Sequence, residues 1–144
     1  MNQMAKIIRI VGVQPEDIMD VWPYVKEYFA SFETRAKGFL TASDLLTSVI
    51  DGKMQCWIAV GEEISDVRAC GLTEIPKGRK KVVVFSFCSG KGREDWRDAM
   101  VDEIERWSRH IGADTLRIIC RPGWTKEIKS LGYRETHRIL DKEL

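Results

Sequence analysis

The sequence has no long apolar run, no large excess of charge of either sign, and only two histidines in 144 residues. No stretch approaches the ~18 apolar residues that a membrane-spanning helix needs. The first residues, "MNQMAKIIRIVGV", lack the apolar core and cleavage site of a signal peptide. The 23 basic and 22 acidic residues give a net charge of +1, which argues against general nucleic-acid binding but allows a local basic pocket.

Clustered cysteines are absent as well. The four cysteines are far apart, each lies in an apolar run, and none belongs to a Cys-x-x-Cys pair. Because zinc needs clustered ligands, we predict no metal site and no disulfide, but four buried, reduced thiols. Such thiols are typical of a cytoplasmic protein. They are Cys56, Cys70, Cys88 and Cys120.

Two hydrophobic periodicities divide the chain. Apolar residues at a spacing of three or four predict amphipathic helices, and runs rich in Val, Ile and aromatic residues predict strands. The expected helices cover residues 14–32, 41–52, 96–111 and 121–132, and Pro23 is expected to kink or split the first of them. The expected strands cover residues 6–13, 54–61, 67–76, 80–89, 112–120 and 133–144.

The order of these elements, β-αα-βββ-α-β-α-β, predicts a single α/β domain over residues 1–144 with a mixed sheet and helices on both faces. Short connections make the three middle strands antiparallel neighbours. The helix between the fourth strand (80–89) and the fifth strand (112–120) supplies a crossover, so these two strands are expected to be parallel.

A glycine-rich basic corner, "SGKGR" (89–93), joins the fourth strand to the long helix. The first turn of a helix leaves N–H groups unpaired and carries partial positive charge, and glycines allow a phosphate to approach that backbone. Lys91 and Arg93 add full positive charges. The corner lacks the P-loop pattern and the third glycine of a dinucleotide site. It is either a phosphate-binding corner or only a sharp turn between a strand and a helix.

The element order and two local patterns resemble the Gcn5-related N-acetyltransferase (GNAT) superfamily over nearly the whole chain. The cofactor motif of that family, Gln/Arg-x-x-Gly-x-Gly/Ala, aligns with residues 87–92, "FCSGKG". The segment 121–133, "RPGWTKEIKSLGY", occupies the place of the family's Asn-x-x-Ala, short helix and Gly-Phe. The Trp-Pro in the first helix, the Arg-Pro-Gly-Trp turn and the C-terminal end look especially like GNAT-like proteins of tailed phages.

The resemblance implies acetyl-CoA, or another acyl-CoA, as a ligand, with an amine as the acyl acceptor. The residues that it places at the cofactor are Phe87, Cys88, Gly90, Lys91, Gly92, Arg93, Arg121 and Trp124. Of these, Trp124 lies one turn into a helix at the expected cofactor edge. The other tryptophans have the spacing of core residues.

Three positions depart from the family's pattern. Phe87 stands where the motif begins with Gln or Arg, Arg121 stands for the asparagine, and Ile128 stands for a helix tyrosine that protonates the leaving thiolate in many members. No carboxylate lies in "VVVFSFC", so Glu74 is the nearest candidate general base. A solvated carboxylate at a strand end is the alternative interpretation of Glu74.

Two functions from different classes remain open at this point. The first is an acyl-CoA-dependent N-acyltransferase that transfers an acetyl group to an amine. The second is a non-catalytic GNAT-like protein that binds another protein, such as a virion component. A fold alone does not decide between them.

Overall fold

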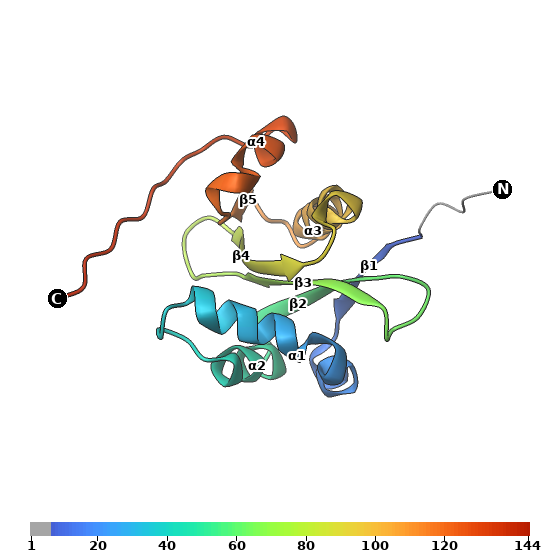
Figure 1. Ribbon diagram of the computed structural model, residues 1–144. Helices are drawn as coiled ribbons and strands as arrows, with labels where there is room; N and C mark the ends of the chain where they lie inside the picture. Colours follow the sequence, from blue (N-terminus) through green and yellow to red (C-terminus); the bar gives the residue numbers. More distant parts are fainter. Residues whose placement is uncertain (1–6) are drawn as a thin grey trace.

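The computed structural model describes residues 7–144, which form one five-stranded sheet and four α-helices (Figure 1). The strands are β1 (Arg9–Val13), β2 (Met54–Val60), β3 (Val67–Glu74), β4 (Val82–Gly90) and β5 (Thr115–Ile118). The helices are α1 (Ile18–Arg35), α2 (Ala42–Ile50), α3 (Arg97–His110) and α4 (Pro122–Ser130). Short 3-10 turns, η1 (Pro15–Asp17) and η2 (Arg93–Asp95), precede α1 and α3.

The sheet has the strand order β1-β2-β3-β4-β5. Its first four strands are antiparallel neighbours, and β5 pairs with β4 in parallel, from Val82 opposite Thr115 to Phe85 opposite Ile118. These pairings confirm the antiparallel middle of the chain and the parallel contact across the helical crossover. The mixed α/β architecture is therefore as the sequence predicts.

Helices cover both faces of the sheet, with α1 and α2 on one side and α3 and α4 on the other (Figure 1). Each face has its own apolar core. The core beneath α1 and α2 is centred on Phe29 and Phe32 of α1, while Trp57 of β2 and Trp96 pack in the core on the α3 side. The prediction that these two tryptophans are packing residues is confirmed.

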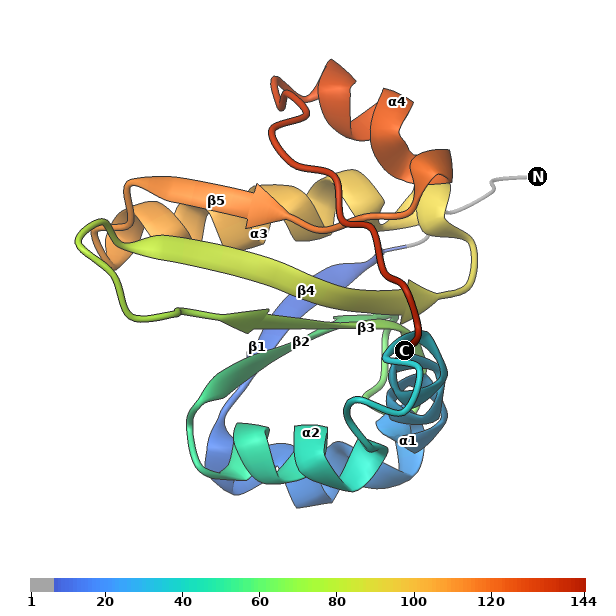
Figure 2. The same ribbon diagram turned by 90° about the vertical axis from the view of Figure 1, so that its left-hand side faces the viewer.

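Local signals explain where α2 begins and why α1 is continuous. Thr41 caps α2: its hydroxyl accepts from the Asp44 N–H, and the Asp44 side chain accepts from the Thr41 N–H, which is a capping box. The expected split at Pro23 is wrong, since α1 continues from Ile18 to Arg35. The helix nevertheless changes direction along its length, in line with the alternative of a kink (Figures 1 and 2). Pro23 lies in the second turn of α1, so its missing N–H removes one backbone hydrogen bond near the N-terminal end of the helix.

Two other expectations also fail. The last predicted strand is not formed, because residues 133–144 have no strand structure and pair with no strand of the described chain. Cys56 and Cys70 are buried with their sulfur atoms 3.7 Å apart, but Cys120 is exposed, since it follows the end of β5. None of the helices within residues 7–144 has the length and apolar character to cross a membrane.

Candidate functional site

Strands β4 and β5 separate after four pairs of residues, and the divergence defines the site (Figure 2). The last hydrogen bond between these two segments runs from the Ile119 N–H to the Phe85 carbonyl, at 3.0 Å. Directly afterwards β4 bulges: Phe87 lies opposite Leu72 and Phe85 opposite Thr73, so Ser86 is the extra residue. Beyond the bulge, β4 continues to Gly90 without a β5 partner.

Both glycines of the corner have structural roles of their own. A Cβ on Gly90 would lie 2.5 Å from the Ala69 Cβ and 2.7 Å from the Trp96 ring, so Gly90 allows β3 and Trp96 to pack closely against the strand end. Gly92 has a φ of +63°, a left-handed conformation that favours glycine. The glycine spacing alone therefore does not establish a ligand site.

The backbone N–H groups of the corner divide into paired and unpaired ones. The Lys91 N–H donates to the Arg68 carbonyl at 2.9 Å, so it is not available to a ligand, contrary to the simplest expectation for this corner. Within residues 7–144, the N–H groups of Gly92, Arg93 and Glu94 have no hydrogen-bond acceptor. Three consecutive N–H groups at the start of this helical segment are therefore available to a hydrogen-bond acceptor outside the chain.

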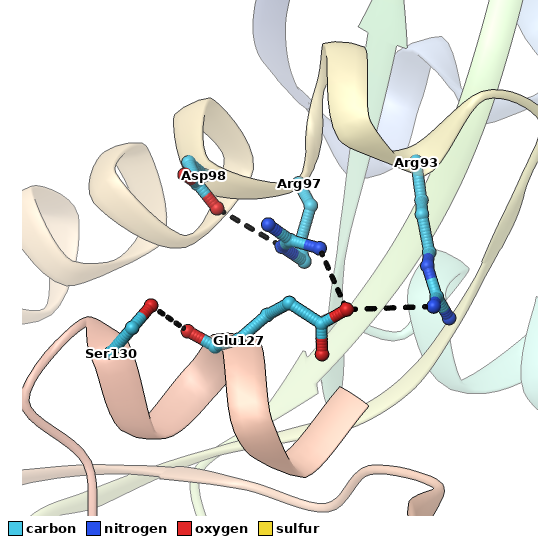
Figure 3. A network of polar contacts seen from close by, with 5 residues as sticks. All are labelled: Arg93, Arg97, Asp98, Glu127 and Ser130. Atoms are coloured by element: carbon cyan, nitrogen blue, oxygen red, sulfur yellow. Dashed lines mark hydrogen bonds and ion pairs between the residues drawn. The ribbon is translucent and has the colours of Figure 1, made fainter. Parts of the chain in front are cut away.

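Two arginines at this corner share one carboxylate (Figure 3). Glu127 of α4 lies 3.6 Å from a guanidinium nitrogen of Arg93 and 3.8 Å from one of Arg97. Arg97 also contacts Asp98 at 3.0 Å. The second carboxylate oxygen of Glu127, Oε2, is buried without a hydrogen-bond partner. The positive charges of these two arginines are thus balanced by the carboxylates of Glu127 and Asp98, and an anionic ligand at the same guanidinium groups would lie next to Glu127.

Trp124 forms the aromatic edge of the corner. Its ring lies 5.9 Å from the Trp96 ring, and the Arg93 guanidinium carbon lies 5.9 Å from its centre. The side chain is only partly buried. The structure thus brings Trp124 together with Arg93, as the expected cofactor edge requires.

Phe87 and Cys88, which the resemblance places at the cofactor, have side chains that pack against the apolar cores. The Phe87 ring packs on Phe32, and the Cys88 sulfur lies 3.9 Å from the Met100 sulfur, so the two side chains enter opposite cores. Burial raises the pKa of Cys88 to about 12, which keeps its thiol protonated. The Cys88 carbonyl accepts a hydrogen bond from the Arg35 guanidinium, which reaches β4 from the end of α1.

Arg35 and Arg121 bring positive charge to the separating strands. Burial, followed by the charge of nearby Arg121, lowers the pKa of Arg35. Arg121 is exposed at the N-cap of α4. Among the ion pairs of the described residues, neither arginine has a carboxylate partner.

Glu74, the expected base, lies at the bulge. The Ser86 hydroxyl donates to its carboxylate at 3.3 Å, and Glu74 pairs with Val84 at the end of β3. Ile128, which replaces the family's tyrosine, is buried in the core under α4. In the part of the chain that the structure describes, no group of three or more His, Cys, Asp or Glu side chains is placed to hold a metal ion.

Sequence reasoning missed Arg35, Arg97 and Glu127. Arg35 and Glu127 are distant in sequence from the groups that they contact, so no local spacing indicates their roles. Arg97 could have been identified from the sequence, since it is a basic residue in the first turn of a helix that follows a glycine corner.

No protein-family model matches the sequence, and no curated protein matches it. Solved structures do match. A probable acetyltransferase has a TM-score of 0.68 and 16% identity, over 94% of this chain and 96% of its own. An aminoglycoside N-acetyltransferase in complex with CoA has a TM-score of 0.68 and 12% identity, over 100% and 99%. Glucosamine-6-phosphate N-acetyltransferase from Arabidopsis thaliana has a TM-score of 0.69 and 10% identity, over 96% and 99%. The chain thus shares the overall fold of these acetyltransferases.

Proposed function

We propose that the protein is an acyl-CoA-dependent N-acyltransferase that acts on an amine. The observation that carries the proposal is the set of unpaired N–H groups at Gly92, Arg93 and Glu94, next to the cationic side chains of Lys91, Arg93 and Arg97. This set lies at the end of a strand that has separated from its neighbour. The fold neighbour that is in complex with CoA supports CoA as the ligand.

The pyrophosphate of CoA fits the donors of the corner. The three N–H groups would bind phosphate oxygens, and Arg93 and Lys91 would balance their charge. Trp124 would contact the ligand beside Arg93. The rest of an acyl-CoA would extend along the unpaired edge of β4 toward Ser86. On this edge, the Cys88 carbonyl already accepts a hydrogen bond from Arg35.

The chemical step needs a neutral amine close to the thioester. Acyl-CoA would supply an activated acyl group, whose carbonyl carbon would form a bond to the amine nitrogen as the carbon–sulfur bond breaks. CoA would leave as a thiolate and take up a proton from water. Glu74, at the bulge, would accept the proton that the amine loses, directly or through the Ser86 hydroxyl. Holding the amine in place supplies much of the remaining rate enhancement.

Calorimetry with acetyl-CoA tests the donor site. We expect the wild type to bind acetyl-CoA and Arg93→Gln to bind it at least several-fold more weakly, because a charge that contacts the phosphates is lost. Arg106→Gln is the matched control, since Arg106 is a 70% exposed arginine farther along the same region of the chain. Absence of binding to the wild type, or equal weakening in both variants, would refute the proposed site.

A second candidate is a protein-binding module that retains the fold without the chemistry. Two observations favour it: Arg35 already uses the Cys88 carbonyl, and buried Ile128 offers no acid for the leaving thiolate. Release of CoA thiol in the presence of a panel of amines separates the two candidates. Binding of acetyl-CoA without any turnover supports the non-catalytic function.

A further inference from the structure

A polar cluster lies on the α1 side of β4, where this strand continues beyond its contact with β5. The Ser89 hydroxyl of β4 donates to the Ser31 hydroxyl of α1 at 3.3 Å. One turn further along α1, the Arg35 guanidinium donates to the Cys88 carbonyl. Both contacts lie past Phe85, the last residue of β4 that is bonded to the β5 segment. The end of α1 therefore places a cation beside the part of β4 that β5 has left.

Arg121 brings a second cation to the same place. It follows Ile119, whose N–H makes the last bond to β4, by two positions, and it is the N-cap of α4. Burial, and then the nearby charge of Arg121, lower the pKa of Arg35, so the two positive charges interact. No ion pair with a carboxylate balances either arginine within residues 7–144. Two like charges that are held together without a counter-ion favour an anion between them.

The Arg35 side chain has unused hydrogen-bond donors. Its Nη1 donates to the Cys88 carbonyl, but its Nε is buried and has no hydrogen-bond partner in the described part of the chain. Buried donors without a partner are rare in folded proteins. A carboxylate or a phosphate accepts hydrogen bonds from a guanidinium in a bidentate geometry, so either group would suit the donors that the Cys88 carbonyl leaves unused.

The expected base, Glu74, lies on the same face of the sheet as these arginines. Glu74 is directly opposite Met54, a residue of the core beneath α1 and α2, and opposite residues of paired strands point to the same face. The Ser86 hydroxyl donates to the Glu74 carboxylate. Ser86 and Cys88 are separated by about 7 Å along an extended strand. An acceptor whose amine lies near Ser86 would therefore reach the arginines with its other end.

We propose that Arg35 and Arg121 bind an anionic group of the acyl acceptor, so that the substrate is an amine that also carries a carboxylate or a phosphate. This inference rests on the proposed acyl transfer and narrows its acceptor from amines in general to amino acids and similar anionic amines. Arg121 then contacts the acceptor, whereas the resemblance to the acetyltransferase family places it at the cofactor. The cofactor keeps the separate donors at Gly92, Arg93 and Glu94.

Nuclear magnetic resonance of the free protein, titrated with δ-aminovalerate, tests the site without turnover. This ligand carries its amine and its carboxylate at the ends of a short chain, and its neutral amide is the matched ligand. We expect the acid to bind about tenfold more tightly than the amide, because only the acid makes hydrogen bonds between two charged groups. The Nε–H signal of Arg35, assigned by its loss in Arg35→Lys, should shift with the acid alone.

Arg121→Gln should remove most of this preference for the acid, and it should not impair folding, because Arg121 is exposed. The matched control is Arg79→Gln. Arg79 is also exposed and has no ion pair within residues 7–144, but it lies in the loop before β4, at the opposite end of that strand. Equal affinity for acid and amide, or equal losses in both variants, would overturn the proposal.

Saturation with CoA distinguishes the acceptor from the cofactor as the source of the anion. With CoA bound, δ-aminovalerate should still bind and still shift the Arg35 signal. Exclusion of the acid by CoA would mean that the arginines bind a phosphate of the cofactor, which would also overturn the proposal. If the wild type does not bind acetyl-CoA, the acyl transfer itself is refuted. If it binds acetyl-CoA and does not prefer the acid, only this inference fails.

Discussion

Replacing Glu127 with glutamine should tighten the binding of CoA about fivefold. The Glu127 carboxylate contacts Arg93 and Arg97 at 3.6 and 3.8 Å. A phosphate bound to the same guanidinium groups would therefore be separated from the carboxylate only by those groups. Two unit charges ~6 Å apart repel by about 3 kcal/mol at an effective dielectric constant of ~20. The Glu127 side chain is 33% exposed, and solvent screening reduces the repulsion to about 1 kcal/mol, which is about fivefold in Kd.

Calorimetric titration with CoA at low ionic strength measures this change. Glu103→Gln is the matched control, because the Glu103 side chain is 34% exposed and contacts Arg106 at 3.2 Å on α3. It removes the same charge from a similar ion pair more than one helical turn away from the corner. Added salt should reduce the gain in affinity of Glu127→Gln.

The result that refutes this reasoning is weaker binding by Glu127→Gln. It would mean that Glu127 orients the two arginines for the ligand rather than competing with it. An equal gain in Glu103→Gln would also refute it, since the effect would then come from net charge alone. Thermal unfolding of both variants should differ little from the wild type, because partly exposed ion pairs stabilise a fold by less than about 1 kcal/mol.

Three further outcomes follow from single side chains. Gly90→Ala should lower the free energy of unfolding by about 1–3 kcal/mol in denaturant titrations, because its Cβ would clash with Trp96 and the Ala69 side chain, whereas Gly78→Ala should have little effect. Glu74→Gln should leave acetyl-CoA binding unchanged and slow any acyl transfer, most strongly at low pH where amines are protonated; equal rates would exclude Glu74 as the base. Burial and then the hydrogen bond to Glu105 raise the pKa of Tyr133 above 10.0, so stability present below pH 10 is lost as the pH rises beyond it. Tyr133→Phe should reduce that alkaline loss in pH-dependent melts, and an unchanged profile would contradict the assignment.

The elements with strong local signals were predictable from the sequence. The capping residue Thr41, the periodicity of α3 and the crossover between β4 and β5 each depend on nearby residues or on a general rule of topology. The position of Glu74 at the end of a strand was also indicated, although its contact with Ser86 depends on a bulge that no spacing reveals.

The features that the sequence did not predict have a common physical cause: they depend on tertiary contacts between residues that are distant in sequence. The segment 133–144 has the composition of a strand, but a strand needs a neighbour, and the chain gives it none. The packing of Trp96 and Ala69 against Gly90 is likewise a tertiary contact, and the linear motif does not reveal it. The unavailable N–H of Lys91 results from its bond to Arg68 on the next strand, which a linear motif cannot show.

The short parallel contact between β4 and β5 has a consequence for how the molecule opens. Within residues 7–144, β5 is joined to the other strands by four residue pairs with β4 and by flanking bonds from Ile119 to Phe85 and between Asp114 and Lys81, whereas β2 to β4 are linked along most of their lengths. Local unfolding follows the least connected unit of a structure. The unit from β5 to α4 should therefore detach before the antiparallel strands do, and its amides should lose protection at denaturant concentrations that leave β2 and β3 intact. Such an opening would widen the space between β4 and β5 and admit a long ligand without unfolding the rest of the sheet.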